Sequence, residues 1–300
     1  MTAEGAPPEG LGFGTAMISA HESVFGQFRR FARLAAVPFA LMLLIAVLKF
    51  PVGHYAPDAE IVLLVADLLP FALLGLAQSR AVLTGEAAGF LPPQPLGRRT
   101  WIYLGYALLM IVMAAVPLMV LLLGAINVGY VLSDGGGDFA SGPWLAALGF
   151  IGLLVLLWVL ARLSLVYPAL AVDRKLGLVG AWRLSRGSGL KLLGIQVVIF
   201  LVTLLAGVIG AAVLGGGFKI SLGASSVLAP GMTVADALID RGPAIVWSAL
   251  VSIAGYGLIM GAYASAFAQL SGWGAPRRAP AAELGDPGAF RVTAAGTQVD

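Results

Sequence analysis

Six long apolar runs constrain the fold of this chain more than any other feature of its sequence. They cover approximately residues 34–50, 60–80, 101–126, 145–168, 190–214 and 244–270. A helix of about 20 apolar residues crosses the hydrocarbon core of a bilayer, where an open backbone would lack hydrogen-bond partners. The sequence therefore predicts an all-α, polytopic membrane protein with six transmembrane helices.

The scarcity of charge points to the same class of protein. Only 11% of the 300 residues are charged, against roughly 25% in soluble domains. The chain has no cysteine, which excludes disulfides, thiolate metal sites and iron–sulfur clusters. It also lacks the zinc-protease, serine-hydrolase and phosphate-loop motifs. We therefore expect no enzymatic activity, no cofactor and no metal site.

The basic residues are sorted by loop, which predicts the topology. If the chain crosses the membrane six times, one side carries fifteen of the 18 Lys and Arg residues, and the other carries Lys49, Lys219 and Arg241. Basic residues concentrate in cytoplasmic loops. We therefore expect a bacterial-type inner membrane protein with both termini in the cytoplasm. Because the charge follows the loops, the net charge of +3 does not indicate nucleic-acid binding.

The two ends of the chain are expected to be disordered, over residues 1–14 and 273–300, leaving residues 15–272 as the transmembrane domain. Between the N-terminal segment and the first run, residues 19–35 have helical spacing of apolar side chains, with basic residues available for the other face. This pattern predicts an amphipathic helix in the cytoplasmic interface. The alternative is an extension of the first span.

Residues 161–191 collect a third of the chain's basic residues. Arg162 is expected about one turn inside the cytoplasmic boundary, from which its side chain can reach the headgroups. Pro168 should end or kink the fourth span, because it lacks an N–H and crowds the preceding turn. Asp173 is then a candidate N-cap for a short amphipathic helix after span 4.

That second amphipathic helix carries Trp182, Arg183 and Arg186, and Arg174 precedes it. A basic turn with a tryptophan is typical of a membrane anchor at the cytoplasmic face. The functional alternative is contact with a lipid headgroup or a protein partner, since arginine binds phosphate through two N–H groups. Arg162, Arg174, Trp182, Arg183 and Arg186 are the candidate contact residues.

Asp67 lies inside the second apolar run, where an ionised carboxylate is costly unless it is paired or solvated. Ser248 and Ser252, one helical turn apart in the sixth run, are expected at a similar depth and are candidate partners; Lys49 could also reach it. Pro70 should weaken the helix beside Asp67. The group is either a polar contact between helices or a proton- or ion-linked carboxyl that lines a cavity.

Small residues recur every fourth position in two runs, at Gly257, Gly261 and Ser265 and at Gly207, Ala211 and Gly215. Such faces allow close approach of helix backbones. They indicate packing within the bundle, with a dimer face as the alternative.

One stretch of about 30 residues resembles a known family. It comprises Arg162, Ser164, Leu165, Pro168, Ala169, Asp173 and Arg174, followed by Ala181, Ser185 and Gly187. The pattern is similar to the six-span membrane domain of glycerophosphodiester phosphodiesterases and its stand-alone bacterial relatives. The catalytic barrel of the fused enzymes is absent here. The resemblance therefore implies a non-catalytic, lipid-associated membrane module, and no catalytic residue is carried over.

These observations favour a non-catalytic inner-membrane protein that associates with membrane lipid or serves as a scaffold or subunit for a protein partner at the cytoplasmic face. The alternative is a small transporter or permease subunit with Asp67 on the path. In that case the short helix near Trp182 would dock a cytoplasmic partner.

Overall fold

Every element that the structure describes is helical, as the sequence predicts. A computed structural model describes residues 11–56, 59–85, 97–134, 142–214 and 234–273. The elements in chain order are α1 (Phe13–His21), the π-helical turn η1 (Glu22–Gly26), α2 (Phe28–Tyr55), α3 (Glu60–Ala66), α4 (Leu68–Thr84), α5 (Arg98–Asp134), α6 (Gly142–Leu163), α7 (Val166–Ala171), α8 (Gly177–Leu184), α9 (Gly189–Val213) and α10 (Val234–Ser271).

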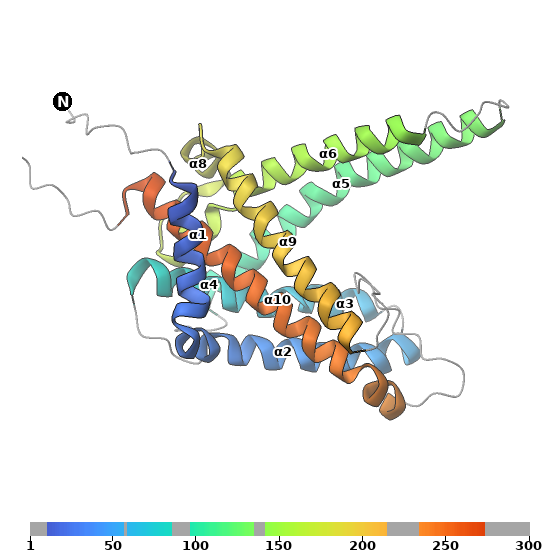
Figure 1. The fold of residues 1–300 in the computed structure, drawn as a ribbon, viewed down its shortest axis with the longest axis horizontal. Helices are drawn as coiled ribbons and strands as arrows, with labels where there is room; N and C mark the ends of the chain where they lie inside the picture. Colours follow the sequence, from blue (N-terminus) through green and yellow to red (C-terminus); the bar gives the residue numbers. More distant parts are fainter. Residues whose placement is uncertain (1–10, 57–58, 86–96, 135–141, 215–233, 274–300) are drawn as a thin grey trace, which may run out of the picture.

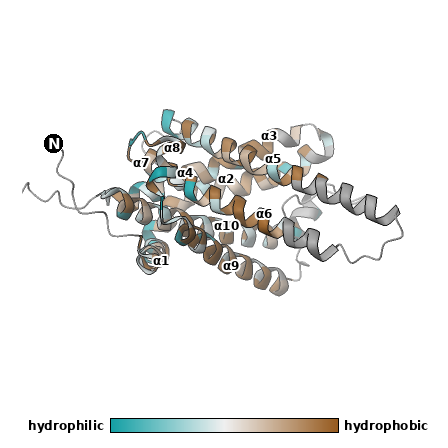
Figure 2. Cartoon of the chain, turned by 90° about the horizontal axis from the view of Figure 1, so that it is seen from above, coloured by the Kyte–Doolittle hydropathy of each residue, from teal (hydrophilic) through white to brown (hydrophobic). Residues whose placement is uncertain are grey.

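Six segments of these helices are long and apolar enough to cross a membrane, which confirms the predicted span count. They are Phe28–Val52, Val62–Thr84, Arg98–Val120, Gly149–Ala171, Gly189–Gly210 and Arg241–Ser271. Large apolar side chains cover their outer surfaces, for example Val116 on α5 and Phe200 on α9. Hydrophobic colour accordingly runs along the helices in Figure 2. A protein with this surface requires lipid around it.

Helix α10 is the central element of the bundle. It packs against α1, α2, α4 and α9, whereas α5 and α6 run side by side away from it and join the bundle through α4 and α9 (Figure 1). The largest buried cluster lies where α4, α7 and the last turns of α10 meet, and it includes Leu165, Val166 and Phe267. The packed core is therefore concentrated at one end of the molecule.

A group of tyrosines that no sequence pattern predicted links four helices inside this core. The Tyr103 and Tyr256 hydroxyls share a hydrogen bond, and the rings of Tyr103 and Tyr167 lie 4.4 Å apart. Tyr263 donates a hydrogen bond of 2.9 Å to Gln196 Oε1. Because hydroxyls in an apolar core need partners, these contacts fix the positions of α5, α7, α9 and α10 relative to one another.

The two described ends of the chain meet at this same end of the bundle. The Gly12 amide donates to Gln269 Oε1 at 2.9 Å, and the Lys191 ammonium donates to the Leu11 carbonyl at 2.8 Å. Trp273 Nε1 donates to the Leu83 carbonyl at 3.3 Å. An even number of spans brings both ends of a chain to one side. The start of α2 and the helices α7 and α8 also lie at this end (Figure 1). Because most of the described arginines are on or beside these elements, we call it the basic end.

The predicted disorder extended too far into the chain at both ends. Leu11 is buried and α1 begins at Phe13, although residues 1–14 were expected to lack structure. Trp273 packs against Phe267, although residue 273 was assigned to the tail. Short polar and glycine-rich segments give no sequence signal when a few of their residues dock onto a core. Residues 1–10 and 274–300 lie outside the described part of the chain.

The segment before the first span is divided differently from the prediction. A single helix over 19–35 was expected, but Gln27 has non-helical backbone angles and separates α1 and η1 from α2. Helix α1 lies across the start of α2 in Figure 1. It buries Ala16 and Ala20 and exposes Ile18, which is 61% accessible. A separate helix therefore precedes the span, but it is α1, which carries no lysine or arginine. The basic residues of the predicted amphipathic helix lie at the start of α2, which is the alternative of an extended first span.

One of the two small-residue faces packs inside the molecule. A Cβ placed on Gly257 would collide with the Phe31 ring, and one on Gly261 would lie 3.3 Å from the backbone of Ala20. A Cβ on Gly207 would meet nothing within 4 Å, while Gly215 lies outside the described residues. Helices α1 and α2 therefore pack closely against this face of α10.

We expect Gly257→Ala to lower the free energy of unfolding by about 1–3 kcal/mol, because the new methyl group overpacks the site filled by Phe31. Gly207→Ala is the matched control, with the same chemical change in open space, and it should leave stability unchanged or slightly raised. Thermal unfolding of the two variants in detergent checks this. Equal unfolding temperatures would contradict the packing described here.

Candidate functional site

The chain turns back into the bundle through residues 164–188, which we call the elbow. Helix α6 ends at Leu163, α7 and α8 follow as short helices, and α9 begins at Gly189. Pro168 lies inside α7, and its ring crowds the carbonyl four residues earlier, at Ser164, where the helix is interrupted. The predicted interruption by Pro168 is thus confirmed, with the break placed one turn before the proline.

Arg162 is held inside the elbow. Its side chain is 7% accessible, and its guanidinium lies 3.6 Å from the ring centroid of Trp182 and 5.0 Å from that of Trp158. Nε donates to Ser185 Oγ at 2.9 Å, and Nη2 donates to the Trp182 carbonyl at 2.7 Å. Cation–π contact and charge-assisted hydrogen bonds both stabilise this arrangement. Arg162 therefore fixes α8 to α6, and its N–H groups point inward.

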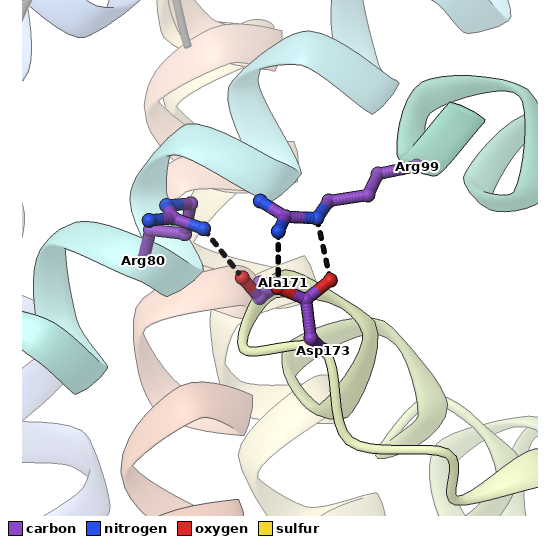
Figure 3. A network of polar contacts seen from close by, with 4 residues as sticks. All are labelled: Arg80, Arg99, Ala171 and Asp173. Carbon is purple, nitrogen blue, oxygen red and sulfur yellow. Dashed lines mark hydrogen bonds and ion pairs between the residues drawn. The ribbon is translucent and has the colours of Figure 1, made fainter. Parts of the chain in front are cut away.

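Two further arginines fix the loop between α7 and α8 (Figure 3). Arg99 on α5 forms a two-point ion pair with Asp173, with its Nε 2.6 Å from Oδ1, and Arg80 on α4 donates to the Ala171 carbonyl at 3.2 Å. Asp173 adopts a left-handed backbone conformation, with φ of 59°. Aspartate tolerates this region better than most residues.

The predicted role of Asp173 as a helix cap is wrong. The residue at the N-cap position of α8 is Leu176, and no side chain caps that helix. The carboxylate of Asp173 is engaged by Arg99 instead. The sequence pattern of an acidic residue shortly before a helical run could not reveal a partner that lies 74 residues earlier in the chain.

Carbonyl groups at helix ends are a common target of the inward basic side chains at this end of the bundle. Arg30 donates to the Ala81 carbonyl at 3.1 Å near the end of α4. Arg80 and Arg162 donate in the same way to carbonyls in the last turns of α7 and α8. The last carbonyls of a helix lack partners within the helix and carry partial negative charge. These arginines therefore join neighbouring helices as well as marking topology.

A second set of basic side chains points outward. Its exposed members include Arg29, Arg33, Arg174, Lys175, Arg183 and Arg186. Arg174 also lies over the Phe267 ring at 5.9 Å. Exposed apolar side chains alternate with them, including Val179 at 67% accessibility and part of Trp182. Of the predicted contact residues, Arg174, Arg183 and Arg186 are therefore accessible, Trp182 is partly so, and Arg162 is not.

Asp67 forms an ion pair with Lys49, one of the partners considered from the sequence. Their side chains are 31% and 39% accessible, and Asp67 interrupts the helix between α3 and α4. The break precedes Pro70, as expected from the ring's contact with the preceding turn. Ser248 is exposed, Ser252 is half-buried, and among the described contacts neither serine bonds to Asp67.

A polar pocket that the sequence did not reveal lies beside η1, with a volume of about 280 Å³. Its polar lining residues are Ser19, Glu22, Ser23, Gln27, Arg30 and Gln78. Leu34, Ala81 and Val82 form its apolar wall. The π-helical turn places residues from before the first span opposite residues at the end of α4, and such turns are frequent at functional sites. We call this cavity the η1 pocket.

Comparison with known proteins gives no relative: no family model, curated protein or solved structure matches the chain. Within the described residues, no three His, Asp or Glu side chains come close enough together to hold a metal ion. The site must therefore be interpreted from its own geometry.

We expect Arg162→Lys to lower the free energy of unfolding by about 1–3 kcal/mol although the charge is retained. Lysine cannot reproduce the two directed hydrogen bonds or the planar contact with the Trp182 ring. Arg183→Lys is the matched control, because that arginine is exposed on α8, next to Trp182 in the sequence. Thermal unfolding in detergent measures both. An unchanged unfolding temperature for Arg162→Lys would show that the internal contacts of Arg162 contribute little.

Proposed function

We propose that this chain is a non-catalytic integral membrane protein that associates with phospholipid headgroups at its basic end. We place it in a bacterial-type inner membrane with both termini in the cytoplasm, on the distribution of Lys and Arg between loops. The observation that carries the proposal is the division of the arginines. One set holds helix ends inside the protein, and the other is exposed among apolar side chains at the start of α2 and around α8.

This outward set has the composition of a membrane interface. Basic residues near an anionic membrane surface contribute roughly 1 kcal/mol each. Tryptophan and other apolar side chains at the same height enter the boundary between headgroups and acyl chains. Arg183 and Arg186 flank the last turn of α8, while Val179 and Trp182 provide exposed apolar surface on the same helix. The helix is therefore suited to lie in the headgroup layer.

The double variant Arg183→Gln/Arg186→Gln should reduce retention of an anionic phospholipid by up to roughly thirtyfold, because two exposed charges of roughly 1 kcal/mol each are lost. Retention is measured by native mass spectrometry after titration with phosphatidylglycerol. Arg241→Gln is the control, since Arg241 lies in the first turns of α10, away from α8.

Retention of phosphatidylcholine should be the same in the wild type and in both variants. Equal loss of anionic lipid from the Arg241→Gln control would indicate that net charge, rather than the basic end, attracts lipid. No loss from the double variant would contradict the proposed role of α8.

A transporter or permease subunit is the second candidate, and one observation favours it. The ion pair of Asp67 and Lys49 lies at a helix interruption inside a span, and broken helices often line transport paths. Transport requires water to reach Asp67 from the cytoplasm as well as from outside. An Asp67→Cys thiol, unique in this cysteine-free chain, would then react with a membrane-impermeant reagent added on the cytoplasmic side. The lipid-associated role predicts no such reaction.

A further inference from the structure

The η1 pocket contains two opposite charges, carried by Glu22 and Arg30. We propose that it binds a group that carries both a phosphate and a primary ammonium, as the headgroup of an aminophospholipid does. The phosphate would bind beside Arg30 and the ammonium beside Glu22. This inference rests on the lipid association proposed above and names a lipid class that the exposed arginines alone would not select.

The pocket lies at the depth where headgroups are found. Its lining comes from residues 19–34 and 78–85. These two segments contain the start of the span Phe28–Val52 and the end of the span Val62–Thr84. Phe25 and Phe28, which neighbour lining residues of the pocket in the sequence, are exposed, at 51% and 62% accessibility. A pocket with polar lining residues at the ends of two spans, in a segment with exposed aromatic side chains, is therefore expected at the membrane boundary.

Arg30 is held in position at the pocket wall. Its Nη1 donates to Gln27 Oε1 at 2.9 Å, and its Nη2 donates to the Ala81 carbonyl at 3.1 Å. These contacts fix the guanidinium between α2 and α4, so its charge needs little reorganisation when an anion arrives. Arginine is the side chain best suited to bind a phosphate through more than one oxygen.

The pocket has a polar wall with internal hydrogen bonds. Gln78 is only 1% accessible, and its Nε2 donates to Ser23 Oγ at 3.0 Å. Ser23 in turn donates to the Ala20 carbonyl at 2.8 Å. A buried glutamine at the end of a transmembrane helix is costly unless its amide is satisfied. The chain maintains this polar arrangement within otherwise apolar packing, which is expected of a site that accepts a polar group.

The size of the pocket fits a headgroup and excludes a whole lipid. Its volume of about 280 Å³ lies just below the range of roughly 300–1,000 Å³ for small-molecule sites. The acyl chains would therefore remain outside, against the apolar surface of the spans. Leu34 and Val82 line the pocket from α2 and α4 and provide the transition from polar to apolar surface.

Glu22 provides the discrimination between headgroups. A glycerol headgroup carries no cation, so its lipid would bring only negative charge toward the carboxylate. A choline headgroup carries a cation without N–H donors and forms no hydrogen bond with Glu22. A primary ammonium has three donors and complements the carboxylate. The η1 pocket should therefore prefer phosphatidylethanolamine to both phosphatidylglycerol and phosphatidylcholine.

The test is lipid binding by native mass spectrometry of the full chain in detergent, with the three phospholipids of identical acyl chains. We expect Glu22→Gln to lower phosphatidylethanolamine binding by roughly threefold to fivefold, the upper range for a charge pair at an exposed position. The substitution keeps the shape of an exposed side chain and should not affect folding. Arg30→Gln should weaken binding of all three lipids through the phosphate. Arg241→Gln is its control, because Arg241 lies neither in the pocket nor among the exposed arginines of the basic end.

Equal binding of phosphatidylethanolamine by the wild type and Glu22→Gln would overturn the proposal, and so would a wild-type preference for phosphatidylglycerol at this site. Soluble phosphoethanolamine distinguishes the source of the group. If it competes with the lipid only in proteins that retain Glu22, the site is supported for either source. If it binds while the lipid does not, the ligand is the soluble compound.

The test of the η1 pocket can be distinguished from the test of lipid association at α8. The variant Arg183→Gln/Arg186→Gln should lose phosphatidylglycerol and keep its response to Glu22→Gln. Loss of anionic lipid in that variant, with no effect of Glu22→Gln, would therefore support lipid association and contradict the pocket alone.

Discussion

A lipid bilayer offers no hydrogen-bond partner to an open backbone, and the structure of this chain depends on how that constraint is met at each break between helices. Where α7 and α8 end, at Ala171 and near Trp182, an arginine from α4 or α6 donates to a carbonyl. Arg30 does the same near the end of α4. A guanidinium presents several N–H donors and remains charged, so it can satisfy a helix-end carbonyl at the polar boundary. The basic end is thus held together by the residues that also determine topology.

The basic residues at this end therefore fall into two sets: some are buried or half-buried and hold helices together, and others are exposed. Arg162 looks like a headgroup contact in the sequence, because it lies one turn inside a boundary and precedes a tryptophan-bearing turn. In the structure its guanidinium faces Ser185 and two indole rings. Arg183, on the neighbouring helix α8, and Arg186, just after that helix, face outward. Lipid association is therefore proposed for the outer set alone, and the inner set provides the rigid support that positions it.

The sequence predicted the features that depend on local physical chemistry. Apolar length identified all six spans, and Pro70 and Pro168 marked the interruptions in the second and fourth. It did not predict features that depend on contacts between distant segments. The ion pair of Arg99 with Asp173, the bond between Tyr103 and Tyr256, and the pocket between η1 and α4 each join residues more than 50 positions apart. Whether an arginine in a basic cluster is exposed or buried also depends on such distant contacts, so the sequence could not predict it.

Helices α1 and α8 are expected at headgroup depth if the basic end associates with lipid, and a depth measurement tests this most directly. The chain has no cysteine, so a spin label can be attached singly through Ile18→Cys, Val179→Cys or Val116→Cys in lipid nanodiscs. All three side chains are exposed, the first two on the short helices and Val116 in the span on α5. Relaxation by oxygen and by a water-soluble nickel complex should place residues 18 and 179 near the headgroups and residue 116 in the hydrocarbon. Labels at 18 and 179 that behave like a fully water-exposed site, or like residue 116, would contradict the account.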